Sequence, residues 1–173
     1  GEGVAPGQVP IPDMIKRYRF HETSSASAIY GVVGAPIGHS LSPSMHNAGF
    51  AAADLDAIYI PFEATDPEDI FGLLEALNVT GVSVTAPFKE TLMPWLCSVD
   101  ELGKRVGAVN TLRRGPGGWE GLNTDVPGFL APLQRGGGVR GLQTTVLGAG
   151  GSARAVAVAL AMSGAMVTVC ARR

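Results

Sequence analysis

The feature that most constrains the fold is a repeated alternation of short β-branched runs with longer helical patterns. Strands are expected over residues 29–34, 57–62 and 80–87, with helices over 43–54 and 67–78 between them. Ser42-Pro43 and Asp66-Pro67 each place an N-cap residue before a proline at the first helical position. Strands that alternate with helices in this way predict an α/β domain with a parallel sheet.

The second half of the chain predicts a hairpin and then a further strand-helix-strand unit. A helical pair precedes a β-hairpin over residues 108–125, in which Gly117-Gly118 supplies the positive φ of the turn. A helix over 125–135 ends at three consecutive glycines, 136–138, which predict a hinge or domain boundary. Beyond them we expect a strand over 144–150, a helix over 151–164 and a strand over 165–173.

These patterns predict three segments with boundaries after residues 27 and 128. Residues 1–27 are loop-rich, residues 28–128 form a substrate-binding α/β domain, and residues 129–173 form the first half of a Rossmann-type domain. A βαβ half leaves strand edges and one face uncovered, so we expect the intact protein to continue beyond residue 173.

The composition favours a small-molecule partner. The 173 residues carry a formal net charge of −2, which argues against general binding to nucleic acid or to an anionic membrane. No apolar run approaches the length of a membrane span, and no secretory signal is visible. Two distant cysteines, Cys97 and Cys170, form neither a disulfide framework nor a metal cluster, which fits a cytoplasmic location.

A dinucleotide-binding pattern lies where the last predicted helix begins. Gly148, Gly150 and Ala153 form G-x-G-x-x-A between an apolar strand and a helix. In this context the glycines permit a tight turn and close approach of a pyrophosphate, which meets the helix N-terminus. The predicted cofactor-binding residues are Gly148, Ala149, Gly150, Gly151, Ser152 and Ala153.

The end of the following strand selects the cofactor. An acid there accepts the ribose 2′-hydroxyl of NAD, whereas an arginine accommodates the 2′-phosphate of NADP. The sequence has Arg172 and Arg173 at this place and no acid. NADP is therefore predicted. The alternative is that both arginines are ordinary exposed residues at a strand end.

Polar residues gather at the predicted carboxyl ends of the strands in the first domain, where open α/β sheets bind ligands. Hydroxyls, amides, one cation and one anion suit a small polyhydroxylated and carboxylated substrate. Each residue alone could be a helix cap, a turn residue or a solvated charge. The set comprises Ser40, Ser42, Thr85, Lys89, Asn110, Thr111, Asn123, Thr124 and Asp125.

Lys89 and Asp125 are the two residues of this set that could together transfer a proton. A lysine beside a carboxylate can stay charged and still pass a proton to a reacting oxygen, which suits an alcohol–ketone redox couple. His39 and His46 are weaker candidates that loop geometry and helix packing explain. The histidine and cysteine spacing predicts no metal site, and no G-x-S-x-G elbow supports a hydrolase.

Five motifs follow one another along the chain, and they are GAPIGHSLSPSMHN, SVTAPFKE, GAVNT, GLNTDVPGF and LGAGGSARA. In this order they resemble the shikimate dehydrogenase family, which reduces 3-dehydroshikimate to shikimate with NADPH on the way to chorismate and the aromatic amino acids. The resemblance implies that Ser40 and Ser42 bind the substrate carboxylate and that Lys89 and Asp125 form the catalytic pair. It implies that Thr85, Asn110 and Asp125 bind substrate hydroxyls, and that residues 148–153 and Arg172 bind NADP.

Two positions depart from the family's pattern, and one further segment resembles another family. Ser83 stands where the family often has asparagine, and Ala171 stands where a second asparagine is frequent. The segment APGQ, which ends at Gln8, is similar to the tail of a type I 3-dehydroquinate dehydratase, so a bifunctional fusion is expected. Two alternatives stay open, which are a quinate or shikimate dehydrogenase that prefers NAD and a non-catalytic metabolite sensor of the same fold.

Overall fold

A parallel pair of strands forms the centre of the first part of the chain. The computed structural model describes residues 8–172. Strands β1 (Ala28–Gly34) and β2 (Ala57–Glu63) pair in parallel from Ala28 opposite Ala57 to Gly34 opposite Glu63. β3 (Gly81–Val84) lies on the other side of β1, where the Thr80 N–H donates to the Ile29 carbonyl at 2.8 Å. The expected parallel strands are thus confirmed.

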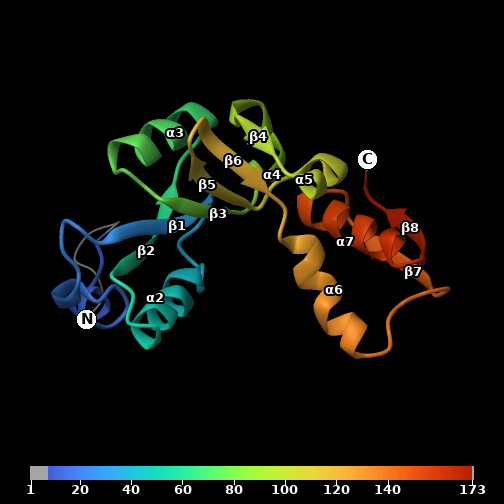
Figure 1. Cartoon of the computed structure of the whole chain (residues 1–173), viewed down its shortest axis with the longest axis horizontal. Helices are drawn as coiled ribbons and strands as arrows, with labels where there is room; N and C mark the ends of the chain where they lie inside the picture. The colour runs from blue at the N-terminus through green and yellow to red at the C-terminus, as the bar shows by residue number, and fades with distance from the viewer. Residues whose placement is uncertain (1–7, 173) are drawn as a thin grey trace. The chain divides into compact units, whose positions relative to one another are not determined.

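Two helices cover this pair on opposite faces. α2 (Ser42–Ala52) and α3 (Pro67–Ala76) connect the strands in sequence, and they lie on either side of β1 in Figure 1. Ile70 and Leu74 of α3 are buried, whereas Leu77, at the C-cap, is 41% exposed. Before β1, a short helix α1 (Ile11–Lys16) and a single 3₁₀ turn η1 (Phe20–Glu22) bury no residue.

The two predicted helix starts have different outcomes. Asp66 caps α3 as expected, because its carboxylate accepts the Asp69 N–H at 2.9 Å. The prediction that Ser42 caps α2 is wrong, since Leu41 occupies the cap position and Ser42 is the first helical residue. The physical reason is that the Ser40 hydroxyl, two residues earlier, accepts the Ser42 N–H at 3.2 Å.

Residue 83 ends a first compact unit of the chain, and residue 84 begins a second. In the second unit the short helix α4 (Phe88–Thr91) and the 3₁₀ turn η2 (Met93–Trp95) precede β4 (Ser98–Val99) and α5 (Glu101–Val106). β5 (Thr111–Gly115) and β6 (Gly118–Leu122) form the predicted antiparallel hairpin. Of the two glycines expected to supply the positive φ, it is Gly118 that does so, at +123°.

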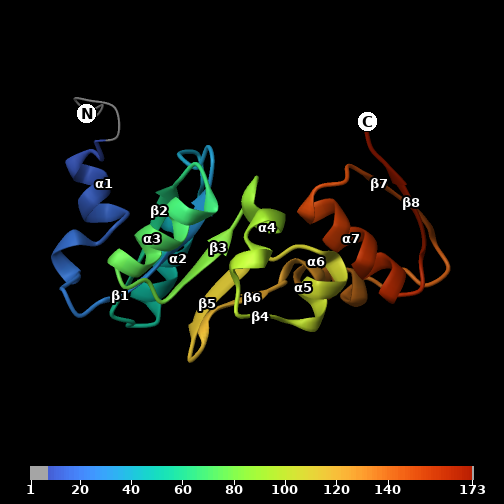
Figure 2. The ribbon, with the colours of Figure 1, turned by 90° about the horizontal axis from the view of Figure 1, so that it is seen from above.

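The last part of the second unit is the expected βαβ arrangement. α6 (Asp125–Arg135) leads to β7 (Gln143–Leu147), α7 (Gly151–Met162) and β8 (Met166–Cys170), and β7 pairs with β8 in parallel. α6 and α7 lie side by side (Figure 2) and share a core of Val126, Ala155 and Ala159 with α5. α5 and the βαβ segment of the second unit therefore share one hydrophobic core.

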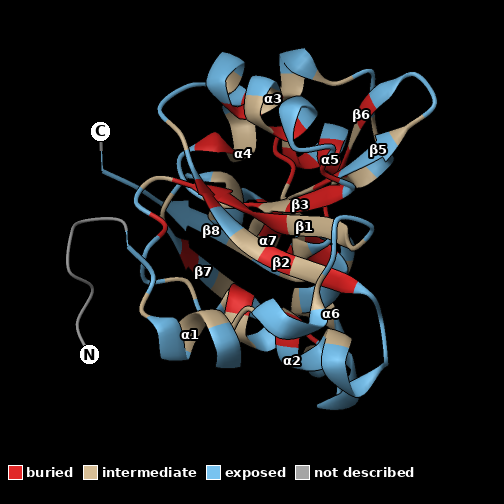
Figure 3. Cartoon of the chain, turned by 90° about the vertical axis from the view of Figure 1, so that its left-hand side faces the viewer, coloured by how far each residue is buried: buried red, intermediate tan, exposed pale blue. Residues whose placement is uncertain are grey.

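Burial differs between the strands of the two units. Figure 3 shows β1 and β3 mainly as buried or intermediate, whereas β8 is largely exposed. Leu147, Met166 and Val169 leave 81%, 57% and 51% of their surface exposed on β7 and β8. No helix in the described part of the chain is long and apolar enough to span a bilayer. The predicted boundaries after residues 27 and 128 stay predictions.

Candidate active site

Lys89 is held in place by its neighbours in sequence. Phe88 is 3% exposed and anchors the start of α4, and the Ala86–Pro87 peptide before it is cis. The Lys89 carbonyl accepts the Val109 N–H at 2.8 Å, which ties α4 to the segment before β5. The hydrogen bond to Val109 ties the lysine backbone to the segment before β5, and the lysine side chain is 15% exposed.

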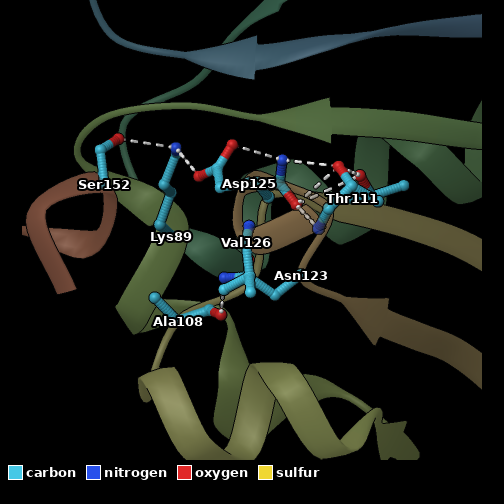
Figure 4. A network of polar contacts seen from close by, with 9 residues as sticks. Lys89, Ala108, Thr111, Asn123, Asp125, Val126 and Ser152 are labelled. Carbon is cyan, nitrogen blue, oxygen red and sulfur yellow. Dashed lines mark hydrogen bonds and ion pairs between the residues drawn. The ribbon is translucent and has the colours of Figure 1, made fainter. Parts of the chain in front are cut away.

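Asp125 is the partner that the sequence predicted for Lys89. Lys89 Nζ lies 2.7 Å from Asp125 Oδ2 (Figure 4), and the aspartate side chain is 30% exposed. Asp125 is the first residue of α6, where the helix dipole favours a negative charge. The two charges are thus paired at short distance and only partly removed from solvent.

Asn110 orients the aspartate. Its Nδ2 donates to Asp125 Oδ1 and to Thr124 Oγ1, both at 2.8 Å, and its Oδ1 accepts the Thr124 N–H at 2.7 Å. The amide therefore fixes the start of α6 and one oxygen of the carboxylate, which leaves the other oxygen for Lys89. Thr111 joins the network through its hydroxyl, 3.3 Å from that of Thr124.

Asn123 has a structural role instead of a place in this network. It is 2% exposed, its Nδ2 donates to the Ala108 carbonyl at 2.9 Å, and its Oδ1 accepts the Val126 N–H at 3.2 Å. Both ends of the amide are satisfied by backbone (Figure 4). Its neighbour in sequence, Thr124, is exposed beside Asn110.

Thr85 and the glycine turn line one cavity with Lys89. The cavity has a volume of about 420 Å³, and all of its lining residues belong to the second unit. They are Thr85, Ala86, Pro87, Lys89, Glu90, Leu147, Gly150, Gly151, Ser152 and Ala153. The predicted proton carrier and the predicted cofactor turn thus share a single hollow.

The turn from β7 into α7 has the features that a pyrophosphate requires. Gly148 has a φ of +121°, which an L side chain rarely adopts, and its N–H donates to the Cys170 carbonyl at 2.8 Å. Gly150 is the N-cap of α7 and offers no side chain to the first N–H groups of the helix. A Cβ on Gly150 would meet no atom within 4 Å, so the approach is open. These residues fit a dinucleotide phosphate.

Other predicted residues are placed as follows. Arg172 follows β8 and is exposed, two residues beyond the Cys170 carbonyl that contacts Gly148; Arg173 lies outside the described residues. Ser40 and Ser42 belong to the first unit at the start of α2.

Within residues 8–172, no group of three or more His, Cys, Asp or Glu side chains could hold a metal ion.

The two histidine candidates lie in the first unit. His39 is exposed in the loop before α2. His46 stacks on the Tyr59 ring with centroids 4.2 Å apart, and burial lowers the pKa of its imidazole. Burial also raises the pKa of Tyr59, whose hydroxyl donates to Ser83 Oγ at 2.8 Å. The stacking agrees with a packing role for His46.

Sequence reasoning missed one contact of the predicted proton carrier. Lys89 Nζ also lies 2.9 Å from Ser152 Oγ, on the first turn of α7 (Figure 4). Ser152 was expected only as a phosphate ligand, because its place in G-x-G-x-x-A gives no sign of a partner 63 residues away. Long-range pairing of this kind has no periodic signal in one sequence.

The described chain combines the parallel pair β1–β2 with a βαβ segment whose glycine turn fits a dinucleotide phosphate. Residues 32–112 match the family model for the shikimate dehydrogenase substrate binding domain.

Whole-chain comparisons extend this likeness. The chain is 47% identical over 140 residues to a shikimate dehydrogenase (NADP⁺) of Thermosynechococcus vestitus, covering 79% of this chain and 49% of that protein. The crystal structure of shikimate dehydrogenase from Aquifex aeolicus superposes with a TM-score of 0.82 and 41% identity, covering 87% of this chain and 57% of that one.

A third relative was solved with ligands. The Thermus thermophilus shikimate 5-dehydrogenase in complex with NADP(H) and shikimate has a TM-score of 0.74 and 38% identity, with 84% of this chain and 56% of that chain covered. The present chain spans about half the length of the curated relatives it matches.

Proposed function

We propose that this chain contributes the proton-transfer pair and the cofactor turn of an NADP-dependent shikimate dehydrogenase, which reversibly reduces 3-dehydroshikimate to shikimate. The observation that carries the proposal is the Lys89–Asp125 ion pair at 2.7 Å in the cavity that the glycine turn lines. A proton carrier beside a dinucleotide turn is the arrangement that ketone reduction requires. The resemblance to NADP⁺-dependent relatives supports the choice of substrate.

The chemistry divides between the pair and the cofactor. When bound, NADPH supplies the hydride that adds to the ketone carbon. The Lys89 ammonium gives its proton to the ketone oxygen, which becomes the hydroxyl of the product, and the neutral amine then takes a proton from solvent. Asp125 holds the ammonium through Oδ2, and Asn110 holds the carboxylate through Oδ1.

The substrate contacts are proposed from the resemblance to shikimate dehydrogenases. Ser40 and Ser42 are the proposed ligands of the substrate carboxylate, and the Ser40 hydroxyl can still donate after it has accepted the Ser42 N–H. Thr85, Asn110 and Asp125 are the proposed ligands of the hydroxyls. Thr85 is supported by its place in the cavity with Lys89.

The cofactor contacts are proposed on the same terms. Residues 148–153 would hold the pyrophosphate through backbone N–H groups at the start of α7, and Arg172, with Arg173, would hold the 2′-phosphate. The domain boundaries after residues 27 and 128 belong to this proposal. So do the cytoplasmic location and the fusion to a 3-dehydroquinate dehydratase, for which residues 5–7 of the supporting segment lie outside the described residues.

The test is a steady-state assay of the natural full-length protein with shikimate or quinate and with NADP⁺ or NAD⁺. We expect turnover of shikimate with NADP⁺, and replacement of Arg172 by alanine should raise KM for NADP⁺ by about 10- to 100-fold with little change for NAD⁺. Arg135→Ala, at the exposed end of α6, is the matched control.

Each alternative predicts a different result. Equal effects of Arg172→Ala on both cofactors would contradict the assignment of the 2′-phosphate. Preference of the wild-type protein for quinate and NAD⁺ would favour the first alternative. Binding of shikimate without turnover would favour a metabolite sensor.

A further inference from the structure

Ser152 joins the proton-transfer pair to the cofactor turn. The Lys89 ammonium has three N–H donors, of which one reaches Asp125 Oδ2 at 2.7 Å and another reaches Ser152 Oγ at 2.9 Å. These two contacts fix the direction of the third donor. Figure 4 shows Lys89 between the two partners, with Ser152 on the first turn of α7 and Asp125 on the other side.

The backbone of the turn also packs against the lysine. A Cβ on Gly151 would lie 3.0 Å from Cβ and 3.1 Å from Cδ of Lys89, and 3.2 Å from Cβ of Ala108. Such contacts are tighter than ordinary van der Waals packing, so glycine at this position lets the helix start approach the lysine stem. Gly151 was expected as a phosphate ligand, and it has this packing role in addition.

The residue after Lys89 makes a second link to the same turn. Arg154 Nη2 lies 3.0 Å from Glu90 Oε2, and Arg154 Nε donates to the Ala149 carbonyl at 3.1 Å. Ala149 is the residue between the two glycines of the motif. Two consecutive residues of α4 therefore contact α7, through Ser152 and through an arginine that also supports the turn.

We propose that Ser152 is a positioning residue that couples cofactor binding to the orientation of Lys89. A serine hydroxyl can accept one hydrogen bond and still donate another. Ser152 Oγ accepts from Lys89, and its O–H stays available to a phosphate oxygen at the start of α7. A phosphate that takes this O–H orients the hydroxyl lone pairs toward Lys89. The proposal rests on the proposed dehydrogenase function and adds to it a link between the two ligand sites.

Coupling of this kind is reciprocal, so each ligand strengthens the binding of the other. Shikimate that contacts Lys89 should bind more tightly when NADP⁺ is present, and NADP⁺ should bind more tightly when shikimate is present. Without the hydroxyl, Lys89 keeps its bond to Asp125 but loses the contact to the turn.

The test uses the full-length protein with Ser152→Ala, which removes the hydroxyl, and Ser152→Thr, which keeps it. Three quantities are measured, which are kcat, the Kd of shikimate with and without NADP⁺, and the Kd of NADP⁺ with and without shikimate by fluorescence titration. Ser163→Ala, at the opposite end of the same helix, is the control for loss of a serine hydroxyl.

We expect Ser152→Ala to lower kcat by about five- to tenfold and to reduce the ligand coupling by a similar factor. Ser152→Thr should retain most of the coupling, and Ser163→Ala should resemble the wild type. A purely structural role for Ser152 would leave the coupling unchanged.

The outcomes separate this inference from the proposed function. A wild-type protein that oxidises shikimate with NADP⁺, together with a Ser152→Ala variant of unchanged kcat and coupling, would overturn the inference alone. A folded wild-type protein that does not turn over shikimate would overturn both. If Ser152→Ala does not fold, Ser152→Gly removes the same hydroxyl. Lost coupling in that variant supports the inference, and unchanged coupling contradicts it.

Discussion

Each unit of the chain contains a polar network built around an asparagine, and the two networks end on different groups. In the first unit Asn47 is 2% exposed and bonds both the N–H and the carbonyl of Tyr59 at 2.8 Å. In the second unit Asn110 bonds the side chains of Thr124 and Asp125, and the network ends on Lys89 in a cavity.

The groups that each asparagine amide bonds distinguish a structural network from a functional one. The Asn47 amide replaces a missing strand neighbour at the outer edge of β2, where it satisfies two backbone groups that would otherwise lack partners. The Asn110 amide orients a charged pair that keeps partial contact with solvent. The first network is expected to govern stability and the second to govern turnover.

The largest expected effect is on turnover. Lys89→Ala should lower kcat for shikimate oxidation by about 10²–10⁴-fold, since it removes the proton carrier, while the free energy of unfolding changes little. Steady-state kinetics and urea unfolding of the full-length protein measure the two quantities. Lys104→Ala, an exposed lysine of α5, is the control. Undiminished kcat in Lys89→Ala would remove the lysine from the mechanism.

The second effect is on stability. Asn47→Ala should lower the free energy of unfolding by about 2–4 kcal/mol, because it leaves the Tyr59 N–H and carbonyl unsatisfied, while kcat of the folded protein stays near the wild-type value. Ser44→Ala on the same helix is the matched control, and urea denaturation is the measurement. A stability equal to that of the control would show that the edge of β2 does not need the amide.

An intermediate effect is expected where orientation alone is lost. Asn110→Ala should lower kcat by about tenfold through misorientation of Asp125, with less loss of stability than Asn47→Ala, because Asn110 is only partly buried. If the two asparagine variants gave the same ratio of lost kcat to lost stability, the proposed division between the networks would be wrong.

The smallest effect concerns pH. Burial lowers the pKa of His46, so the folded state favours the neutral imidazole, and the unfolded state binds more protons as the pH falls below about 6.5. His46 therefore contributes stability above pH 6.5 that is lost as the pH falls through its lowered pKa. The stability difference between pH 5 and pH 8 should be smaller in His46→Phe than in the wild type.

Urea unfolding at the two pH values measures this contribution, and phenylalanine keeps a ring against Tyr59. His39→Gln is the control, because His39 is exposed in a loop. An identical pH dependence in His46→Phe and the wild type would show that the imidazole does not contribute.

Local signals made most of the fold predictable. The Asp66 cap, the end of α3 before Asn78 in the left-handed conformation, and the glycine turn before α7 each depend on a few neighbouring residues. The Lys89–Asp125 pair was predictable because the carboxyl ends of parallel strands converge at one edge of a sheet. The contacts of Asn47 with Tyr59 and of Ser152 with Lys89 were not, because they join residues on different elements and have no periodicity.

The most direct test of the central claim is a double-mutant cycle on Lys89 and Asp125 in the full-length protein, with kcat for NADP⁺-dependent oxidation of shikimate as the readout. If the two residues act as one proton-transfer unit, Lys89→Ala with Asp125→Ala should be about as slow as the slower single variant. Losses of kcat that multiply in the double variant would show that the residues act independently and would contradict the account.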